Sequence, residues 1–168
     1  MSRAFVKEPE GDIPDDLPAL PLSPYPNYVT ARGLAQLRQR LQTAEAQRAA
    51  LDAQAIGARQ TQAYQEREIR WLQARIASAL LVAPASASPE RVGFGCTVTL
   101  EEISSGQIWR YRIVGEDEAN PEQGDISWVS PLARAIEGRS VGDEAVWPRP
   151  AGDFVVEIVG ITAKGESE

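Results

Sequence analysis

A heptad pattern in the first half of the chain is the feature that most limits how it folds. Apolar residues recur at alternating steps of three and four from Leu34 to Ala55, and again from Ile69 to Ala79. Such spacing places these side chains on one face of a helix, where they need another helix to cover them. Ile56-Gly57 interrupts the pattern and Pro84 ends it. The pattern therefore predicts an antiparallel α-helical coiled-coil hairpin about 35 Å long, with its turn near residues 55–60.

Thr30 marks the start of the first helix. It precedes the first apolar repeat and is a plausible N-cap, because its hydroxyl can accept a hydrogen bond from a backbone amide of the first turn.

Arg48 places a charge at one position of the apolar seam. A seam of this kind can also pair between two chains, which would make the protein a coiled-coil assembly module. The charge at Arg48 makes such self-association less favourable, so we expect a monomer.

The second half of the chain has the pattern of strands. Apolar and polar residues alternate over residues 92–100, 108–114, 126–129 and 154–161. Between the last two runs, Ser130 to Gly138 has the N-cap, first-turn proline and terminal glycine of a short helix. These features predict a small, strongly curved antiparallel sheet packed on one helix. The fold class is therefore α+β.

Composition divides the chain further. Six prolines fall within residues 1–27, among several aspartates, which predicts an extended and flexible acidic tail. The predicted segments are a tail at 1–27, the hairpin at 28–83, a linker at 84–90, the C-terminal domain at 91–162 and a short tail at 163–168.

Residue usage excludes several classes of function. The chain has no histidine and one cysteine, which excludes Ser-His and Cys-His catalysis, an internal disulfide and a Cys-clustered zinc site. Cys96 lies in an alternating strand and is expected to be a buried structural thiol. The net charge of −7 argues against stable, direct binding of nucleic acid. No secretory or membrane-spanning segment is evident, so we expect a cytoplasmic protein without membrane attachment.

Charge is distributed unevenly. Residues 31–82 contain eight arginines and four acidic residues, a net charge of +4, whereas the rest of the chain has a net charge of −11. Charge on a two-helix coil is often only a solvated face. A slim, basic projection on an acidic body is also suited to entering a channel.

Four ordered blocks carry a resemblance to a known family: Phe94–Leu100, Tyr111–Ala119, Ile126–Ala135 and Val141–Glu144. Together with the opening of the first helix after Tyr28, they resemble the bacterial GreA/GreB transcript-cleavage factors over roughly residues 28–161. The resemblance implies a coiled-coil hairpin followed by an FKBP-like C-terminal domain. It also implies that the chain binds RNA polymerase, with the C-terminal domain beside the mouth of the secondary channel and the hairpin reaching toward the active centre.

The resemblance places the polymerase-docking residues in the C-terminal domain. Trp128, Ser130 and Pro131 match the family's contact region, and Glu116 and Asp117 could steer the chain toward a basic surface. Each also has a structural explanation. Ser130-Pro131 starts a helix, Trp128 could belong to the core, and the acids could form a solvated loop.

The hairpin tip departs from the family. In the cleavage factors, tip acids help to hold a second magnesium ion that activates water for cutting backtracked RNA. Here the nearest local match begins at Gly57 and places Ala58 and Thr61 at the two acid positions, with Arg59 between them. The nearest remaining acids are Asp52 and Glu66, either an alternative functional pair or ordinary helix-surface charges.

These observations favour a non-enzymatic regulator that occupies the secondary channel without efficient transcript cleavage. It would have no catalytic residues, no metal site and no cofactor of its own, and magnesium would enter only as an ion of the polymerase. Alternatives are an active GreB-like elongation factor using Asp52 or Glu66, the short-hairpin regulator of nucleoside diphosphate kinase, and an FKBP-like peptidyl-prolyl isomerase.

Overall fold

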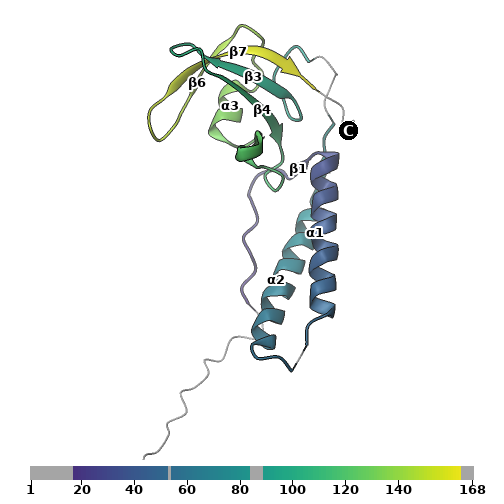
Figure 1. Ribbon diagram of the computed structural model, residues 1–168. Coiled ribbons are helices and arrows are strands. Elements are labelled where there is room, and N and C mark those ends of the chain that lie inside the picture. The colour runs from purple at the N-terminus through teal and green to yellow at the C-terminus, as the bar shows by residue number, and fades with distance from the viewer. Residues whose placement is uncertain (1–16, 53, 84–88, 164–168) are drawn as a thin grey trace, which may run out of the picture.

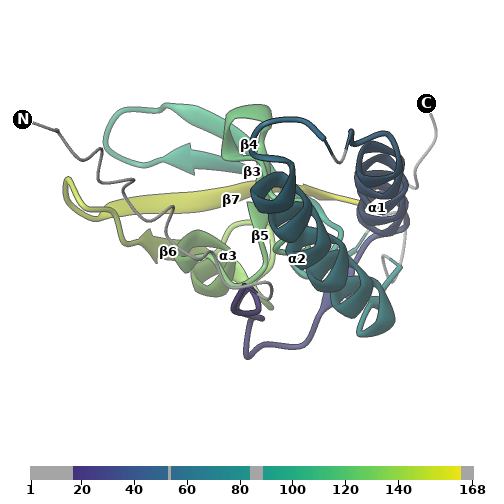
Figure 2. The same ribbon diagram turned by 90° about the horizontal axis from the view of Figure 1, so that it is seen from below.

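A helical hairpin projects from a small β domain (Figure 1). The computed structural model describes residues 17–52, 54–83 and 89–163. Helix α1 (Ala31–Ala49) and helix α2 (Ala58–Ala77) lie side by side, and the sheet lies beyond one end of the pair (Figures 1 and 2). The predicted α+β class is confirmed.

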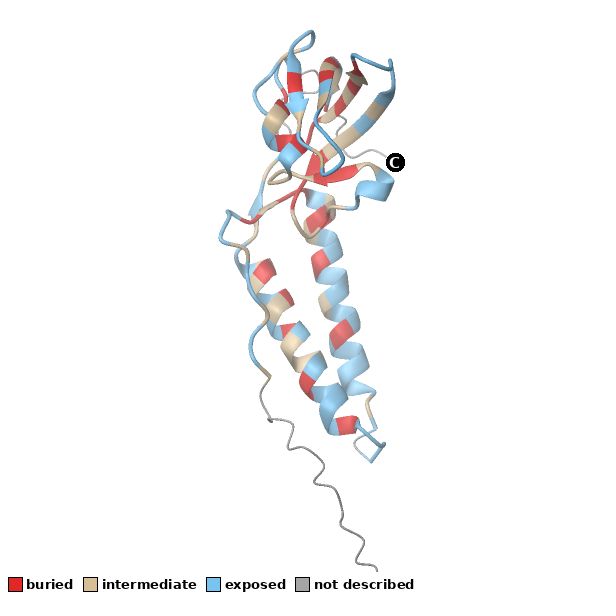
Figure 3. Cartoon of the chain, turned by 90° about the vertical axis from the view of Figure 1, so that its left-hand side faces the viewer, coloured by how far each residue is buried: buried red, intermediate tan, exposed pale blue. Residues whose placement is uncertain are grey.

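The hairpin is held together by a narrow apolar seam. Its buried members are Val29, Leu37, Ala44, Ile69 and Leu72. Figure 3 shows such buried positions in red, separated along the helices by exposed and intermediate residues. Leu37 and Leu72 are 2% and 0% exposed. Burying a leucine side chain this fully stabilises a fold by roughly 1.5–3 kcal/mol relative to leaving it exposed.

The hairpin turn comes earlier than the heptad pattern predicted. Helix α1 ends at Ala49, and residues 50–57 connect it to α2. Arg48, at a seam position, is exposed, so the apolar seam of α1 has its last buried member at Ala44. Gly57 then adopts φ +78° immediately before α2, a left-handed conformation that glycine tolerates without strain.

The base of the hairpin is closed by two short parallel strands, β1 (Tyr28–Val29) and β2 (Leu80–Leu81). They join the residues that precede α1 to those that follow α2. Thr30 caps α1 as predicted, since its Oγ1 accepts a hydrogen bond from the Gly33 amide at 2.9 Å.

The second sheet has five strands in the order β5-β4-β3-β7-β6. Their bounds are β3 Thr97–Glu102, β4 Ile108–Val114, β5 Asp125–Ser127, β6 Glu144–Trp147 and β7 Phe154–Thr162. The prediction of a purely antiparallel sheet was wrong, because β5 pairs parallel with β4. The turn η1 (Pro121–Gln123) lies within the connection that brings β5 alongside β4.

One short helix, α3 (Pro131–Ile136), packs against the domain core. Ser130 Oγ accepts a hydrogen bond from the Ala133 amide at 3.2 Å, which confirms the predicted cap. The core beneath α3 contains Val98, Leu100 and Ile158, all 0% exposed. Cys96 is buried as expected, and burial raises the pKa of its thiol against the opposing effect of a hydrogen bond with the Gly93 backbone.

The described part of the predicted N-terminal tail contacts the rest of the molecule. Residues 17–27 contact both the hairpin and the C-terminal domain, as detailed below. Residues 1–16, most of the expected linker (84–88) and residues 164–168 lie outside the described chain. Among the described residues, none of the helices is long and apolar enough to span a membrane.

Candidate functional site

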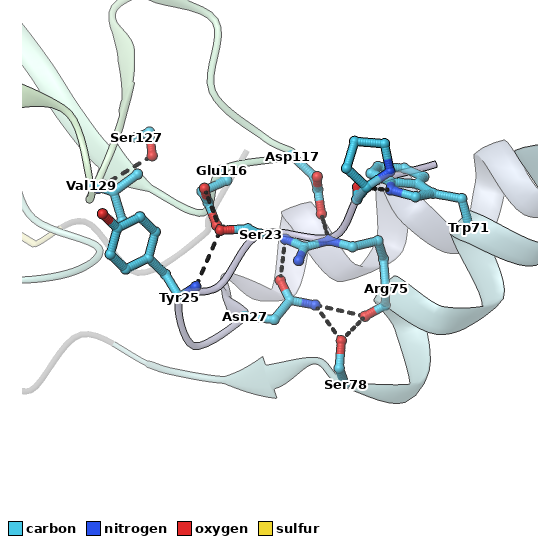
Figure 4. Close-up of polar contacts among 11 residues, drawn as sticks. Ser23, Tyr25, Asn27, Trp71, Arg75, Ser78, Glu116, Asp117, Ser127 and Val129 are labelled. Carbon is cyan, nitrogen blue, oxygen red and sulfur yellow. Dashed lines mark hydrogen bonds and ion pairs between the residues drawn. The ribbon is translucent and has the colours of Figure 1, made fainter. Parts of the chain in front are cut away.

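A buried arginine connects the hairpin to the C-terminal domain (Figure 4). The side chain of Arg75, on α2, is only 4% exposed, and its Nε donates to Asp117 Oδ2 at 2.6 Å. Its Nη2 donates to Asn27 Oδ1 at 2.7 Å. Asn27 Nδ2 in turn donates to the Arg75 carbonyl at 2.7 Å and to Ser78 Oγ at 3.1 Å. A buried charge requires such partners, so this network fixes the last turn of α2 against the domain.

A second arginine holds the first turn of α1 in the same way. Arg32 Nε donates to Glu118 Oε1 at 2.7 Å, and its Nη2 donates to Asp125 Oδ2 at 2.5 Å. Thr30 Oγ1 donates to the other oxygen of Glu118 at 2.6 Å. Partial burial acts to lower the pKa of Arg32, but the hydrogen bonds to Glu118 and Asp125 outweigh it and raise that pKa. Both helices are thus bonded to the loop that follows β4.

The two acids proposed for docking are engaged within the molecule. Asp117 bonds Arg75, and its side chain is 14% exposed. Glu116 Oε1 accepts a hydrogen bond from Ser23 Oγ at 3.0 Å, and Glu116 Oε2 lies 4.0 Å from Arg75 Nη2. The structure therefore gives both acids a role in joining the chain's parts, while their contact with a partner stays a prediction.

Trp128 lies in an aromatic cluster beside this junction. Its ring centroid is 4.9 Å from that of Tyr28 and 6.1 Å from that of Tyr25, the latter in an edge-on arrangement. The residue is half-buried, and its Nε1 is a buried donor without a hydrogen-bond partner within the described chain. Ser130 and Pro131 begin α3 a short distance along the chain, with Pro131 exposed. These three residues are thus brought together, at the edge of the junction.

The candidate tip residues divide between the connection and α2. Asp52 and Gly57 lie in the connection, Ala58 is the first residue of α2 and is buried, and Arg59 and Thr61 follow in its first turns. Glu66 lies farther along α2, about 12 Å from its first residue at 1.5 Å per residue.

Neither of the two alternative acids faces a metal-binding group. Asp52 Oδ1 accepts a hydrogen bond from the Gln54 amide at 2.9 Å, which shapes the turn. Glu66 Oε1 accepts one from Gln62 Nε2 at 2.9 Å along the same helix. No cluster of three or more potential metal ligands occurs among residues 17–52, 54–83 and 89–163.

Sequence reasoning missed several residues of these two regions. Arg75 lies beside the apolar seam of residues 69–79, and its burial depends on Asp117 and Asn27, which are distant in sequence, so the heptad pattern did not single it out. Ile56 was interpreted only as part of a helix stop. It is 107% exposed at the tip, the most exposed large apolar side chain of the described residues.

Sequence comparison relates the chain to transcription elongation factors. Residues 87–163 match the family described as "Transcription elongation factor, GreA/GreB, C-term". A transcription elongation factor GreA of Desulfovibrio desulfuricans is 39% identical over 108 residues, which cover 64% of this chain and 67% of that protein. A GreA of Alkalilimnicola ehrlichii is 37% identical over 150 residues, covering 79% and 95%.

Two solved structures are also similar to the chain. GreA factor homolog 1 (Gfh1) of Thermus thermophilus is 27% identical with a TM-score of 0.40, covering 82% of this chain and 99% of that one. A GreA/GreB factor of Nitrosomonas europaea is 24% identical with a TM-score of 0.41, covering 82% and 98%. On the sequence matches to the GreA proteins, which extend over two thirds or more of their length, the chain belongs to the GreA/GreB family of transcription elongation factors.

Proposed function

We propose that this protein binds bacterial RNA polymerase and regulates transcription by placing its hairpin in the secondary channel, without stimulating efficient transcript cleavage. Polymerase binding rests on the family relationship, since the curated relatives described above are named transcription elongation factor GreA. The protein acts on the polymerase and is not an enzyme in its own right.

The shape and charge of the hairpin support insertion. The hairpin is a narrow rod made of two helices (Figure 1). Exposed arginines lie along it, among them Arg38, Arg48 and Arg59. A basic rod is attracted to a channel through which nucleotides and RNA pass, because phosphates create a negative potential there.

The chemistry of the tip carries the proposal that cleavage is not stimulated. Within residues 50–52 and 54–61 the only acidic side chain is Asp52, and its carboxylate bonds its own turn. Magnesium in such reactions is held by carboxylates together with substrate phosphates. Ala58 and Thr61 supply no carboxylate, and Ile56 presents a bare apolar side chain. The described tip residues therefore do not fit a carboxylate-held magnesium ion.

The test is RNA cleavage in purified backtracked elongation complexes with magnesium, measured together with polymerase affinity. The positive control is a GreA relative assayed in the same complexes. We expect binding of this protein with cleavage at the rate of complexes alone. The Asp52→Ala variant should behave like the unaltered protein in both assays.

Two results would contradict the proposal in different ways. Strong magnesium-dependent cleavage that Asp52→Ala abolishes would make this an active elongation factor with Asp52 as the metal ligand. Absence of binding would mean that the family fold has been kept while the partner has changed.

A further inference from the structure

The N-terminal segment contacts two of the residues through which the C-terminal domain is expected to dock, Glu116 and Trp128. Residues 17–25, here called the strap, run alongside α2 and reach the C-terminal domain (Figures 1 and 4). There Tyr25 meets Trp128. The Trp71 indole Nε1 donates to the Pro21 carbonyl at 3.2 Å. Ser23 Oγ donates to Glu116 at 3.0 Å. The strap thus contacts both parts of the molecule.

Tyr25 makes the strap's main contact with the C-terminal domain. Its ring meets the Trp128 ring edge-on, with 6.1 Å between centroids and 77° between planes. On α3, the guanidinium carbon of Arg134 lies 4.9 Å from the centroid of the Tyr25 ring, a distance suited to a cation–π contact. The ring therefore contacts Trp128 and, through Arg134, the helix α3 that Ser130 and Pro131 begin.

The strap is not needed to join the hairpin to the domain. Arg75 and Arg32 bond the loop of residues 116–118 and Asp125 from the helices themselves. At Gly115, the backbone lies so near the Tyr28 carbonyl oxygen that a Cβ atom would clash with it, so the two backbones are already in close contact. The strap therefore lies over a junction that other contacts already hold together.

The strap is held loosely. Leu22 is 53% exposed and Tyr25 is 43% exposed. Segments with few buried apolar contacts open at low free-energy cost, because little surface is lost to water when they leave. The Trp128 side chain that Tyr25 contacts also carries a buried indole Nε1 donor with no acceptor in the described chain, a group that a partner could satisfy.

We propose that the strap masks the docking surface around Trp128, so that RNA polymerase has to displace Tyr25 before the C-terminal domain engages fully. This inference rests on the proposed function, and it concerns how that binding is regulated. Displacement of the strap consumes part of the binding free energy, so anything that removes the strap strengthens the complex.

The experiment compares polymerase affinity for the full-length chain and for its Tyr25→Ala and Leu22→Ala variants. Tyr25→Ala removes the contacts with Trp128 and Arg134, and we expect affinity to rise roughly threefold to tenfold, the range that such ring contacts support. Leu22→Ala is the matched control on the same segment and should leave affinity within about twofold of the unaltered chain.

A second measurement tests whether the strap occupies this place in the free protein. In ¹H–¹⁵N spectra, the indole resonance of Trp128 should shift in the Tyr25→Ala variant and stay in place in Leu22→Ala. An indole resonance unmoved by Tyr25→Ala would overturn the proposal without any reference to polymerase.

The binding outcomes separate the two proposals. Unchanged affinity of Tyr25→Ala would show that the strap does not compete with the partner, and weaker affinity would show that it forms part of the docking surface. Either result overturns the masking proposal while polymerase binding stands. Loss of binding in all three proteins would refute the proposed function and the masking proposal together.

Discussion

At the scale of single residues, charged side chains on otherwise apolar helix faces decide how the molecule is joined. Arg75 stands on the buried side of α2 and bonds Asp117 and Asn27. Arg32 bonds Glu118 and Asp125 from the first turn of α1. Each pair links residues that are far apart in sequence. These arginines therefore set how the hairpin sits on the C-terminal domain.

Replacing Arg75 by alanine should strongly destabilise the protein. The change leaves the buried Asn27 amide and the Asp117 carboxylate without their main partner, and breaking a buried pair in this way costs about 3–5 kcal/mol. The measurement is the free energy of unfolding in urea. Arg38→Ala, at an exposed position of α1, is the control and should change it by less than about 0.5 kcal/mol. Equal losses of unfolding free energy in the two variants would show that the hydrogen bonds of Arg75 do not stabilise the fold.

Glu102 predicts a specific pH dependence of stability. Hydroxyl groups of Ser105 and Ser104 donate to its carboxylate at 2.6 and 2.7 Å and lower the pKa of Glu102 from 4.5. A carboxylate whose folded pKa is depressed stabilises the fold above pH 4.5, and that contribution is lost as the pH falls through the folded pKa. The Ser104→Ala/Ser105→Ala double variant should thus lose Tm relative to the unaltered protein at about pH 6, and the gap should narrow as the pH falls below 4.5 and through the lowered pKa of Glu102. A gap that does not narrow with falling pH would contradict this explanation.

At the scale of elements, the hairpin and the domain meet through backbone as well as side chains. Gly115, just after β4, lies against the Tyr28 carbonyl of β1 so closely that no Cβ atom fits without movement of the backbone. The same loop then supplies Asp117 and Glu118 to the two helices. Gly115 thus allows β1 and the loop after β4 to come close together, and the bonds of Asp117 and Glu118 hold them there.

Gly115→Ala should destabilise the protein by about 1–3 kcal/mol, because the new methyl group would have to displace backbone atoms at the junction. Gly93→Ala is a matched control in the same domain, since a Cβ atom there would meet nothing within 4 Å. Thermal or urea unfolding of both variants gives the comparison. A Gly115→Ala variant as stable as Gly93→Ala would show that β1 and the loop after β4 do not pack as described.

Sequence patterns predicted those elements whose causes are local. The hairpin follows from its heptads, and α3 follows from Ser130-Pro131, because caps and helix faces depend on neighbouring residues. Strand β6 was missed, since its four residues follow a turn and show little alternation. The parallel β4–β5 pair and the bond between Arg75 and Asp117 join residues separated in sequence, and no local periodicity reports them.

The candidate site shows the same division. Ser130 was predicted correctly as a helix cap, because the proline that follows it and the glycine at residue 138 mark a short helix. The position of Tyr25 over Trp128 joins residues far apart along the chain, and the proline-rich composition of the segment indicated only an extended chain. Contact between a proline-rich segment and a folded surface depends on that surface, which composition does not describe.

At the scale of the whole molecule, charge and shape divide the protein into a basic rod and an acidic body. Residues 31–82 carry a net charge of +4 and the rest a net charge of −11. The rod ends in an exposed Ile56, and Asp52 carries the only carboxylate among residues 50–52 and 54–61. Under the proposed function, the body docks outside the secondary channel and the rod reaches into it. The position of the hairpin tip in the complex therefore tests that proposal.

The most direct measurement is photo-crosslinking from residue 56 in a complex with RNA polymerase, using a photoreactive amino acid in place of Ile56. Because this side chain is fully exposed, the replacement should not disturb the hairpin. If the hairpin enters the secondary channel, crosslinks should form to polymerase segments that line its interior near the active centre. Crosslinks confined to the outer surface of the polymerase, from a variant that binds as tightly as the unaltered protein, would contradict this insertion.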